Sequence, residues 1–125
     1  MAEGKEYIAN TGADGSVSIS EDVVGIIALE ALREVEGCGG VLNTLSSDLA
    51  DLFSKKSGTR GVQVSTENGS VTLDICVSVR YGYSIVKVSR TIQDVVQKAV
   101  SDMTGIPVAA VNVHVGGVTF DKVKQ

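Results

Sequence analysis

The side chains with the greatest chemical reactivity in this sequence are one histidine and two cysteines. His114 is the only histidine, and Cys76 lies in a run where apolar and polar residues alternate. If the last strand neighbours the strand that holds Cys76, the thiol and the imidazole approach each other. Such a pair can form a thiolate nucleophile, and it also supplies half of a zinc site. No third ligand or orienting group accompanies the pair. A small Cys–His or zinc-dependent enzyme is therefore one hypothesis, and polar residues on a solvent-facing sheet are the simpler interpretation.

A second candidate is the glycine-rich segment 37–40, with the sequence Gly-Cys-Gly-Gly, which the hydrophobic periodicity places between two helices. A G-x-x-G loop between two helices is typical of KH-type RNA-binding modules. The loop contains no Lys or Arg, and Glu34 and Glu36 stand where phosphates would have to lie. Glycines also end helices without any ligand. A KH-like RNA-binding module that uses the loop Gly37–Gly40 is the alternative function.

The overall charge and the absence of known catalytic motifs argue against several classes of function. The 125 residues carry a net charge of -4 and give a pI of about 4.9, which argues against a nucleic-acid partner. No P-loop, dinucleotide fingerprint, H-E-x-x-H or G-x-S-x-G motif occurs. We therefore expect no enzyme activity, no catalytic or metal-binding residues and no cofactor.

The sequence also lacks features that would place it in or across a membrane. No apolar stretch is long enough to span a bilayer, and the first residues do not form a signal peptide. Two cysteines make no disulfide framework. We expect a cytoplasmic protein without direct membrane insertion.

The first half of the chain predicts a tail, a strand and two helices. Residues 1–14 are polar and aperiodic, which indicates a flexible N-terminal tail. A short strand follows at 16–19, and Ser18 or Ser20 can cap a helix that begins there. This helix is expected to end at the glycines of segment 37–40, and a second helix is expected at about 42–55.

The strongest local pattern is a hairpin at 61–67 and 70–80 joined by Asn68-Gly69. This dipeptide tolerates the positive φ values of a type I′ turn. A two-residue turn predicts the register, in which Val64 faces Leu73 and Val62 faces Ile75. The pairs Gln63–Asp74 and Ser65–Thr72 then lie on the opposite face.

The second half continues with a long helix and a final strand. Ser84 can cap a helix whose apolar stripe predicts burial, and Gly105 can end it; the stripe consists of Ile85, Val88, Ile92, Val95, Val96, Ala99 and Met103. A last strand is expected at 111–120, followed by a C-terminal tail at 121–125. The whole predicts one α+β domain at 15–120, with the order β-α-α-β-β-α-β and the helices on one face of a mixed or antiparallel sheet. The other face then carries Gln63, Ser65, Thr72, Asp74, Cys76, Ser78, Arg80, Asn112 and His114.

Three segments together resemble a known family. They are SISEDVVGIIALEALREVEGCGGV at 18–41, VTLDICVSVRYGYSI at 71–85 and MTGIPVAAVNVHVGGVTF at 103–120. The sequence resembles the alkaline shock protein family, also called the envelope stress response family, of mostly Gram-positive bacteria. The resemblance covers about residues 16–120, and its most specific part is the C-terminal segment. The two cysteines do not belong to the family pattern.

The resemblance implies a non-enzymatic role in cell-envelope homeostasis. Family members are abundant cytoplasmic proteins that self-associate, and some are held near the membrane by a small membrane-anchored partner. We therefore expect a scaffold or interaction module recruited to the inner face of the cell membrane, acting through its sheet face, a free sheet edge or both. The residues expected at the interaction surface are Asp74, Arg80, Tyr81, Asn112 and His114.

Overall fold

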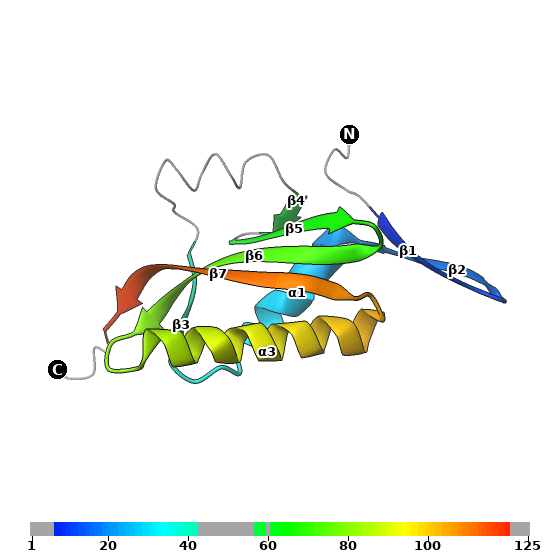
Figure 1. Ribbon diagram of the computed structural model, residues 1–125. Coiled ribbons are helices and arrows are strands. Elements are labelled where there is room, and N and C mark those ends of the chain that lie inside the picture. Colours follow the sequence, from blue (N-terminus) through cyan, green and yellow to red (C-terminus); the bar gives the residue numbers. More distant parts are fainter. Residues whose placement is uncertain (1–6, 43–56, 60, 121–125) are drawn as a thin grey trace.

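The computed structural model describes residues 7–42, 57–59 and 61–120. Residues 43–55 of the second expected helix lie outside the described residues, as do the tail segments 1–6 and 121–125. The remaining elements form a sheet with helices on one side (Figure 1).

A five-stranded mixed sheet is built around one long strand, β6. Strands β5 and β3 pair antiparallel with β6, β4 pairs antiparallel with β5, and β7 pairs parallel with β6. The strands are β3 (Cys38–Val41), β4 (Ser57–Thr59), β5 (Val62–Glu67), β6 (Ser70–Arg80) and β7 (Val108–Thr119). Strand β6 therefore has neighbours along both of its edges.

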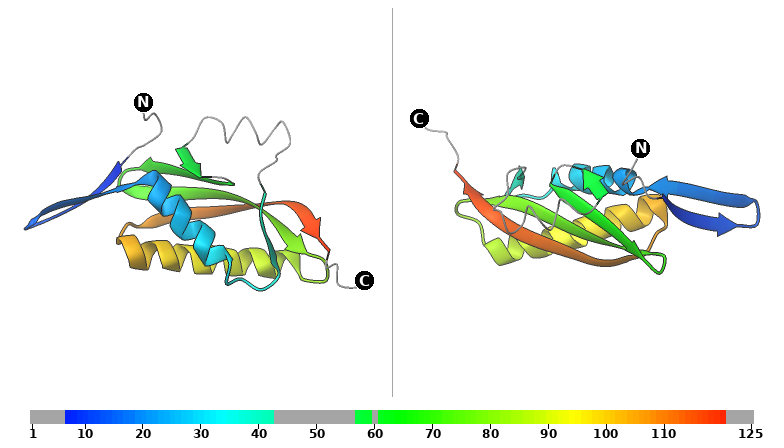
Figure 2. Two further views of the ribbon diagram at one scale, coloured as in Figure 1. Left: turned by 180° about the vertical axis from the view of Figure 1, so that it is seen from behind. Right: turned by 90° about the horizontal axis from the view of Figure 1, so that it is seen from above.

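Two helices, α1 (Glu21–Leu32) and α3 (Ile85–Thr104), cover one face of this sheet (Figure 2). Helix α3 connects β6 to β7, and such a helical crossover is what allows two consecutive strands to run parallel. The prediction of an α+β fold with a mixed or antiparallel sheet and helices on one face is confirmed.

The core consists mainly of valines, because alternate residues of the strands and one row of α3 face each other. On α3 the buried row advances in four-residue steps, as expected for one face of a helix. The fully buried strand residues include Val62, Val64, Val71, Leu73, Ile75, Val77 and Val79, and the buried residues of α3 are Val88, Ile92, Val96, Val100 and Thr104. Ile85 and Met103 are exposed. The predicted stripe is therefore wrong at both ends of the helix, where these residues fall beside the buried row.

Both helices begin and end where particular side chains favour it. Ser20 accepts a hydrogen bond from the backbone N–H of Val23 at 3.3 Å, and Ser84 accepts one from Lys87 at 3.2 Å. Gly105 ends α3 in the left-handed conformation, with a φ of 73°. The predicted caps Ser20 and Ser84 are confirmed, whereas Ser18 lies within a strand and does not cap α1.

The predicted hairpin and its register are confirmed. Val64 pairs with Leu73, and Val62 pairs with Ile75. The turn residues Asn68 and Gly69 have φ values of 54° and 81°, which are the positive angles that a type I′ turn requires. Alternation of apolar residues on both strands fixed this register, because a slip by one residue would expose every core side chain.

A second hairpin lies at the N-terminus, where the sequence predicts a tail. Strand β1 (Tyr7–Gly12) pairs antiparallel with β2 (Gly15–Ser20) and forms a separate two-stranded sheet. Ile8 is paired with Ile19; Ile8 belongs to the core and Ile19 packs against it. The hairpin extends beyond the main sheet at one end of the molecule (Figure 1). Residues 7–12 carry little apolar periodicity, so their strand depends on pairing rather than on pattern.

The glycine-rich segment is a strand and not a loop between helices. Helix α1 ends at Leu32, and Cys38–Val41 then forms β3, whose Cys38 pairs with Val79 of β6. Gly37, which precedes it, is buried with a φ of 91°. The expected loop between two helices at Gly37–Gly40, on which the KH-like alternative depends, is therefore wrong, because the segment leads from α1 into a strand that pairs with β6.

Candidate functional site

The polar face of the sheet brings together three of the predicted surface residues. Asp74 lies on β6, opposite Asn112 of β7 in the parallel register. The side-chain amide of Asn112 donates to Asp74 Oδ1 at 3.1 Å, and His114 Nε2 lies 3.3 Å from the same oxygen. Asp74 is 6% exposed, whereas Asn112 is exposed and His114 lies between these extremes. The three residues form a polar cluster that links β6 to β7.

The chemistry open to this cluster is limited by what surrounds it. A carboxylate that binds an imidazole can orient it as a general base, and covalent catalysis would also need a nucleophilic side chain within reach of that base. The neighbouring thiol, Cys76, is paired with His114 in the register but is fully buried, and burial raises its pKa above the ordinary value of 9.0. A nucleophilic cysteine requires the opposite shift. Cys76 therefore functions as a packing residue.

A metal site at this face is not supported by the side chains present. In the part of the chain that the structure describes, no group of three or more His, Cys, Asp or Glu residues is arranged to hold a metal ion. Structural zinc sites use four ligands and catalytic sites three. Asp74 and His114 together supply two potential ligands.

Alkylation of the native protein is expected to modify Cys38 and to leave Cys76 unmodified at pH 7 to 9. Cys38 is half-buried, whereas Cys76 is buried and its raised pKa keeps the thiol protonated. Iodoacetamide labelling followed by mass spectrometry, with the denatured chain as control, measures both sites. Rapid modification of native Cys76 near pH 7 would contradict this assignment. Because its pKa is raised on folding, the contribution of Cys76 to stability is full below pH 9.0 and is lost as the pH rises above it.

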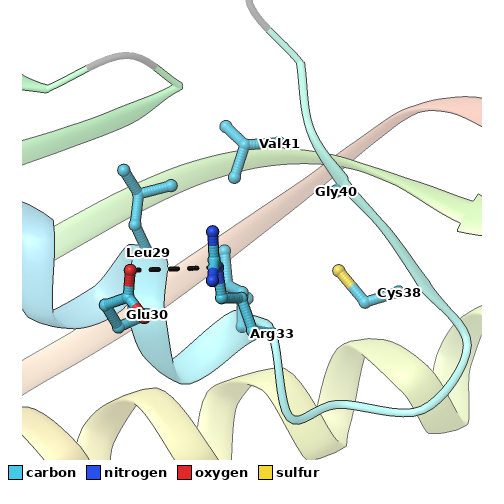
Figure 3. Close-up of a pocket in the computed structure, with 7 residues that line it drawn as sticks. Leu29, Glu30, Arg33, Cys38, Gly40 and Val41 are labelled. Carbon is cyan, nitrogen blue, oxygen red and sulfur yellow. Dashed lines mark ion pairs between the residues drawn. The ribbon is translucent and has the colours of Figure 1, made fainter.

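The other cysteine lies in a separate pocket between α1 and β3. Figure 3 shows Cys38 and Arg33 on opposite sides of it, and the Arg33 side chain pairs with Glu30 at 3.8 Å. The pocket has a volume of about 520 Å³ and is lined by Leu29, Glu30, Leu32, Arg33, Cys38, Gly40 and Val41. Among the described residues that line it there is one carboxylate, Glu30, and no histidine.

Arg80 and Tyr81 lie apart from the polar cluster, at the far end of β6. Arg80 is six residues beyond Asp74, which corresponds to about 20 Å along a strand. The Tyr81 ring stacks on Phe120, with ring centroids 5.2 Å apart and planes inclined by 19°. Sequence reasoning missed Phe120, because the stacking depends on the parallel register in which Arg80 pairs with Thr119. The residues expected to form one interaction surface thus lie in two separate regions, the polar cluster and this aromatic pair.

A membrane-spanning helix needs about 20 consecutive, predominantly apolar residues. Neither α1 nor α3 is long and apolar enough to cross a bilayer.

Comparisons with known proteins find relatives in Gram-positive bacteria. The protein Spy1535 of Streptococcus pyogenes is 41% identical over 109 residues, covering 86% of this chain and 82% of that protein. YqhY of Bacillus subtilis is 29% identical over 111 residues, covering 89% of this chain and 82% of that protein. Among solved structures, the MamM CTD aligns with a TM-score of 0.47 at 16% identity, over 76% of this chain and 92% of that chain. A similarity at that level is too distant to inform function.

The family comparison agrees with the resemblance seen in the three sequence segments. Residues 9–120 match a family described as having a cell envelope-related function. This range contains the sheet, both helices, the polar cluster and the Tyr81–Phe120 pair. The chain belongs to the alkaline shock protein 23 family.

Proposed function

We propose that this protein is a non-enzymatic scaffold of the cell envelope that self-associates and binds a small membrane-anchored partner. Recruitment by that partner would bring it from the cytoplasm to the inner face of the membrane. The family's cell envelope-related function supports the envelope role. Asp74, Asn112 and His114 secure β7 against β6 in this proposal, and Arg80 and Tyr81 belong to the contact surface.

The observation that carries the proposal is the outer edge of β7. Among the described residues, β7 pairs with β6 on one side and with no strand on the other. The carbonyl of Val111 accepts a hydrogen bond from the Gln93 side chain of α3 at 3.0 Å, so it points away from β6. Backbone groups alternate along a strand, and those of Val113 therefore point outward as well. An open edge of this kind can add a strand from another chain.

Replacing Val113 with proline is expected to weaken self-association by about tenfold to thirtyfold. Proline removes the outward N–H but leaves the inward bonds to β6 intact, and an edge strand tolerates it for that reason. In a symmetric pair the lost donor counts twice, at about 1 kcal/mol for each hydrogen bond. Sedimentation velocity over a range of concentrations measures the change.

The matched control is Val113→Ala, which loses similar side-chain packing but keeps the N–H. This variant is expected to associate like the wild-type protein. Equal weakening in both variants would show that the edge backbone does not mediate the contact. A wild-type protein that stays monomeric at every concentration would contradict self-association itself.

The membrane-anchored partner needs a separate experiment. Crosslinking in the native cell followed by mass spectrometry is expected to join this protein to itself and to a small protein with a membrane-spanning helix. Crosslinks confined to proteins without such a helix would contradict the recruitment.

A further inference from the structure

One end of the molecule gathers exposed apolar and aromatic side chains from three elements. We call this surface the aromatic end; it comprises Tyr81, Tyr83, Ile85, Val86, Val118 and Phe120, all exposed. Tyr81, Val86 and Phe120 are the most exposed, at 72%, 65% and 63%. They lie where β6 turns into α3 and where β7 ends, at the narrow end opposite the β1–β2 hairpin (Figure 1). An exposed apolar cluster of this size is typical of an interaction site.

The charges beside the aromatic end are mostly positive. Arg80, Lys87 and Arg90 are exposed on β6 and on the first turns of α3. One carboxylate lies there as well, because Glu36 accepts a hydrogen bond from the hydroxyl of Tyr83 at 3.2 Å. Counting the described residues, the end therefore has a local excess of positive charge on a chain whose net charge is -4.

A groove between α1 and α3 has the opposite character. It has a volume of about 620 Å³ and is lined by Ile26, Ile27, Glu30, Ala31, Glu34, Val95, Lys98, Ala99, Asp102 and Met103. Ile26 and Met103 are 52% and 71% exposed. Three carboxylates and one ammonium group border the groove; Lys98 pairs with Asp102 at 3.0 Å and Arg33 pairs with Glu30 at 3.8 Å, so Glu34 supplies the excess negative charge among these residues. The groove thus combines an apolar floor with an excess of negative charge.

Helix α1 adds exposed apolar side chains to this side of the molecule. Its inner side is buried in the core, yet its outer side carries Val23 and Ile26, which are exposed. Exposed Glu30 lies on the same outer side, so apolar and charged side chains alternate there. The outer side of α1 therefore has the composition of a contact surface.

We propose that the aromatic end of one copy docks into the α1–α3 groove of the next copy. This rests on the proposed self-association and adds to it a second contact, distinct from the β7 edge. Each chain carries one end and one groove of opposite charge, so every copy can accept one neighbour and bind another. Pairing two grooves face to face would bring each Glu34 towards its counterpart, which like-charge repulsion disfavours. A contact between two different surfaces repeats from copy to copy, so it builds a ring or an extended chain.

Two single substitutions test the two halves of this contact without threatening the fold. Val86→Glu places a carboxylate in the first turn of α3, and Met103→Lys places an ammonium group in the last turn. Both positions are exposed, and both charges suit the helix dipole at those ends. Each variant puts a charge of the repelling sign on one surface and leaves the other surface intact. Val17→Glu, on the exposed side of β2, is the matched control for adding a carboxylate to an exposed valine.

Each variant alone is expected to lose the largest assemblies in sedimentation velocity, with association at least tenfold weaker than for wild type and V17E. The intact end of M103K still fits the intact groove of V86E. With the β7-edge contact weakened by Val113→Pro in both chains, fluorescently labelled V86E is therefore expected to bind M103K at least tenfold more tightly than it binds more V86E.

Three results would overturn the docking. V86E and M103K could assemble as the wild type does, which would leave self-association standing without this contact. The labelled mixture could show no preference for M103K, which would indicate a symmetric interface. V86E could instead lose binding to phosphatidylglycerol vesicles while its assembly is unchanged, which would assign the aromatic end to a lipid surface. A wild type that is monomeric throughout would contradict the proposed function itself.

Discussion

Replacing Leu73 with alanine is expected to lower the free energy of unfolding by about 3 to 4 kcal/mol. Leu73 is fully buried in β6, between Val64 of β5 and Val111 of β7. The substitution removes three carbon atoms from the layer between sheet and helices and leaves a cavity there, which is the origin of the large cost of Leu→Ala changes in cores. Domains of this size are stable by about 5 to 15 kcal/mol, so the loss is a large part of the total.

Urea unfolding followed by circular dichroism measures this change as a shift in midpoint with an unchanged m-value. The control is Val118→Ala, which shortens an exposed valine on β7 and is expected to change stability by less than about 0.5 kcal/mol. A Leu73→Ala loss below about 1.5 kcal/mol would contradict the placement of Leu73 at the centre of the core.

Replacing Gly37 with alanine is expected to destabilise the protein by about 2 to 4 kcal/mol. A Cβ at this position would lie 2.7 Å from Tyr83 Cδ2 and 2.8 Å from Val88 Cγ2, both closer than real contacts allow. The φ of 91° adds backbone strain of about 1 kcal/mol for a residue with a side chain. Overpacking accounts for a further 1 to 3 kcal/mol or so. The Tyr83 ring must also move, which disturbs the aromatic end.

Gly40→Ala separates these two contributions. Gly40 also has a positive φ, of 111°, but a Cβ there meets no atom of the described residues within 4 Å. This control carries the backbone strain without the clash, so thermal unfolding of the two variants isolates the packing term. Equal losses would show that Gly37 is needed only for its backbone conformation. An unchanged stability for Gly37→Ala would contradict the close approach of Tyr83.

The hairpin β5–β6 and the helix α3 could be predicted from sequence because local interactions specify them. Asn68 and Gly69 favour one turn, and apolar alternation on both sides of that turn permits one register. Ser84 and Gly105 define the ends of α3 through their own side chain or backbone conformation. In each case the residues that determine the element lie within it or beside it in the chain.

Strands β1 and β3 could not be predicted in the same way. The Cys38–Val41 segment contains two glycines, which have little tendency to form strands. It is extended because β6 presents free backbone groups beside it, and β6 lies some forty residues later in the chain. Strand β1 likewise depends on pairing with β2 more than on its own residues. Such long-range pairing leaves no periodic signal in the sequence.

The residues of the candidate site show the same distinction between local patterns, which sequence can predict, and long-range pairing, which it cannot. Asp74, Asn112 and His114 share a face because residues alternate along strands, and sequence alone predicts that much. The meeting of Tyr81 with Phe120 requires knowing that β6 and β7 run parallel and in which register. The order strand, long helix, strand around α3 contains a signal for the parallel direction, since such crossovers join parallel strands. The register across that crossover has no comparable local signal.

The separate sheet formed by β1 and β2 gives the molecule two levels of cooperativity. A two-stranded hairpin is marginally stable by itself, and this one meets the core through Ile8 and Ile19 near one end. Local opening costs less than global unfolding where few buried contacts must break. The hairpin can therefore open and re-form many times before the domain unfolds. Amide hydrogen exchange in β1 and β2 is then governed by this local opening, whereas exchange in β6 requires global unfolding of the domain.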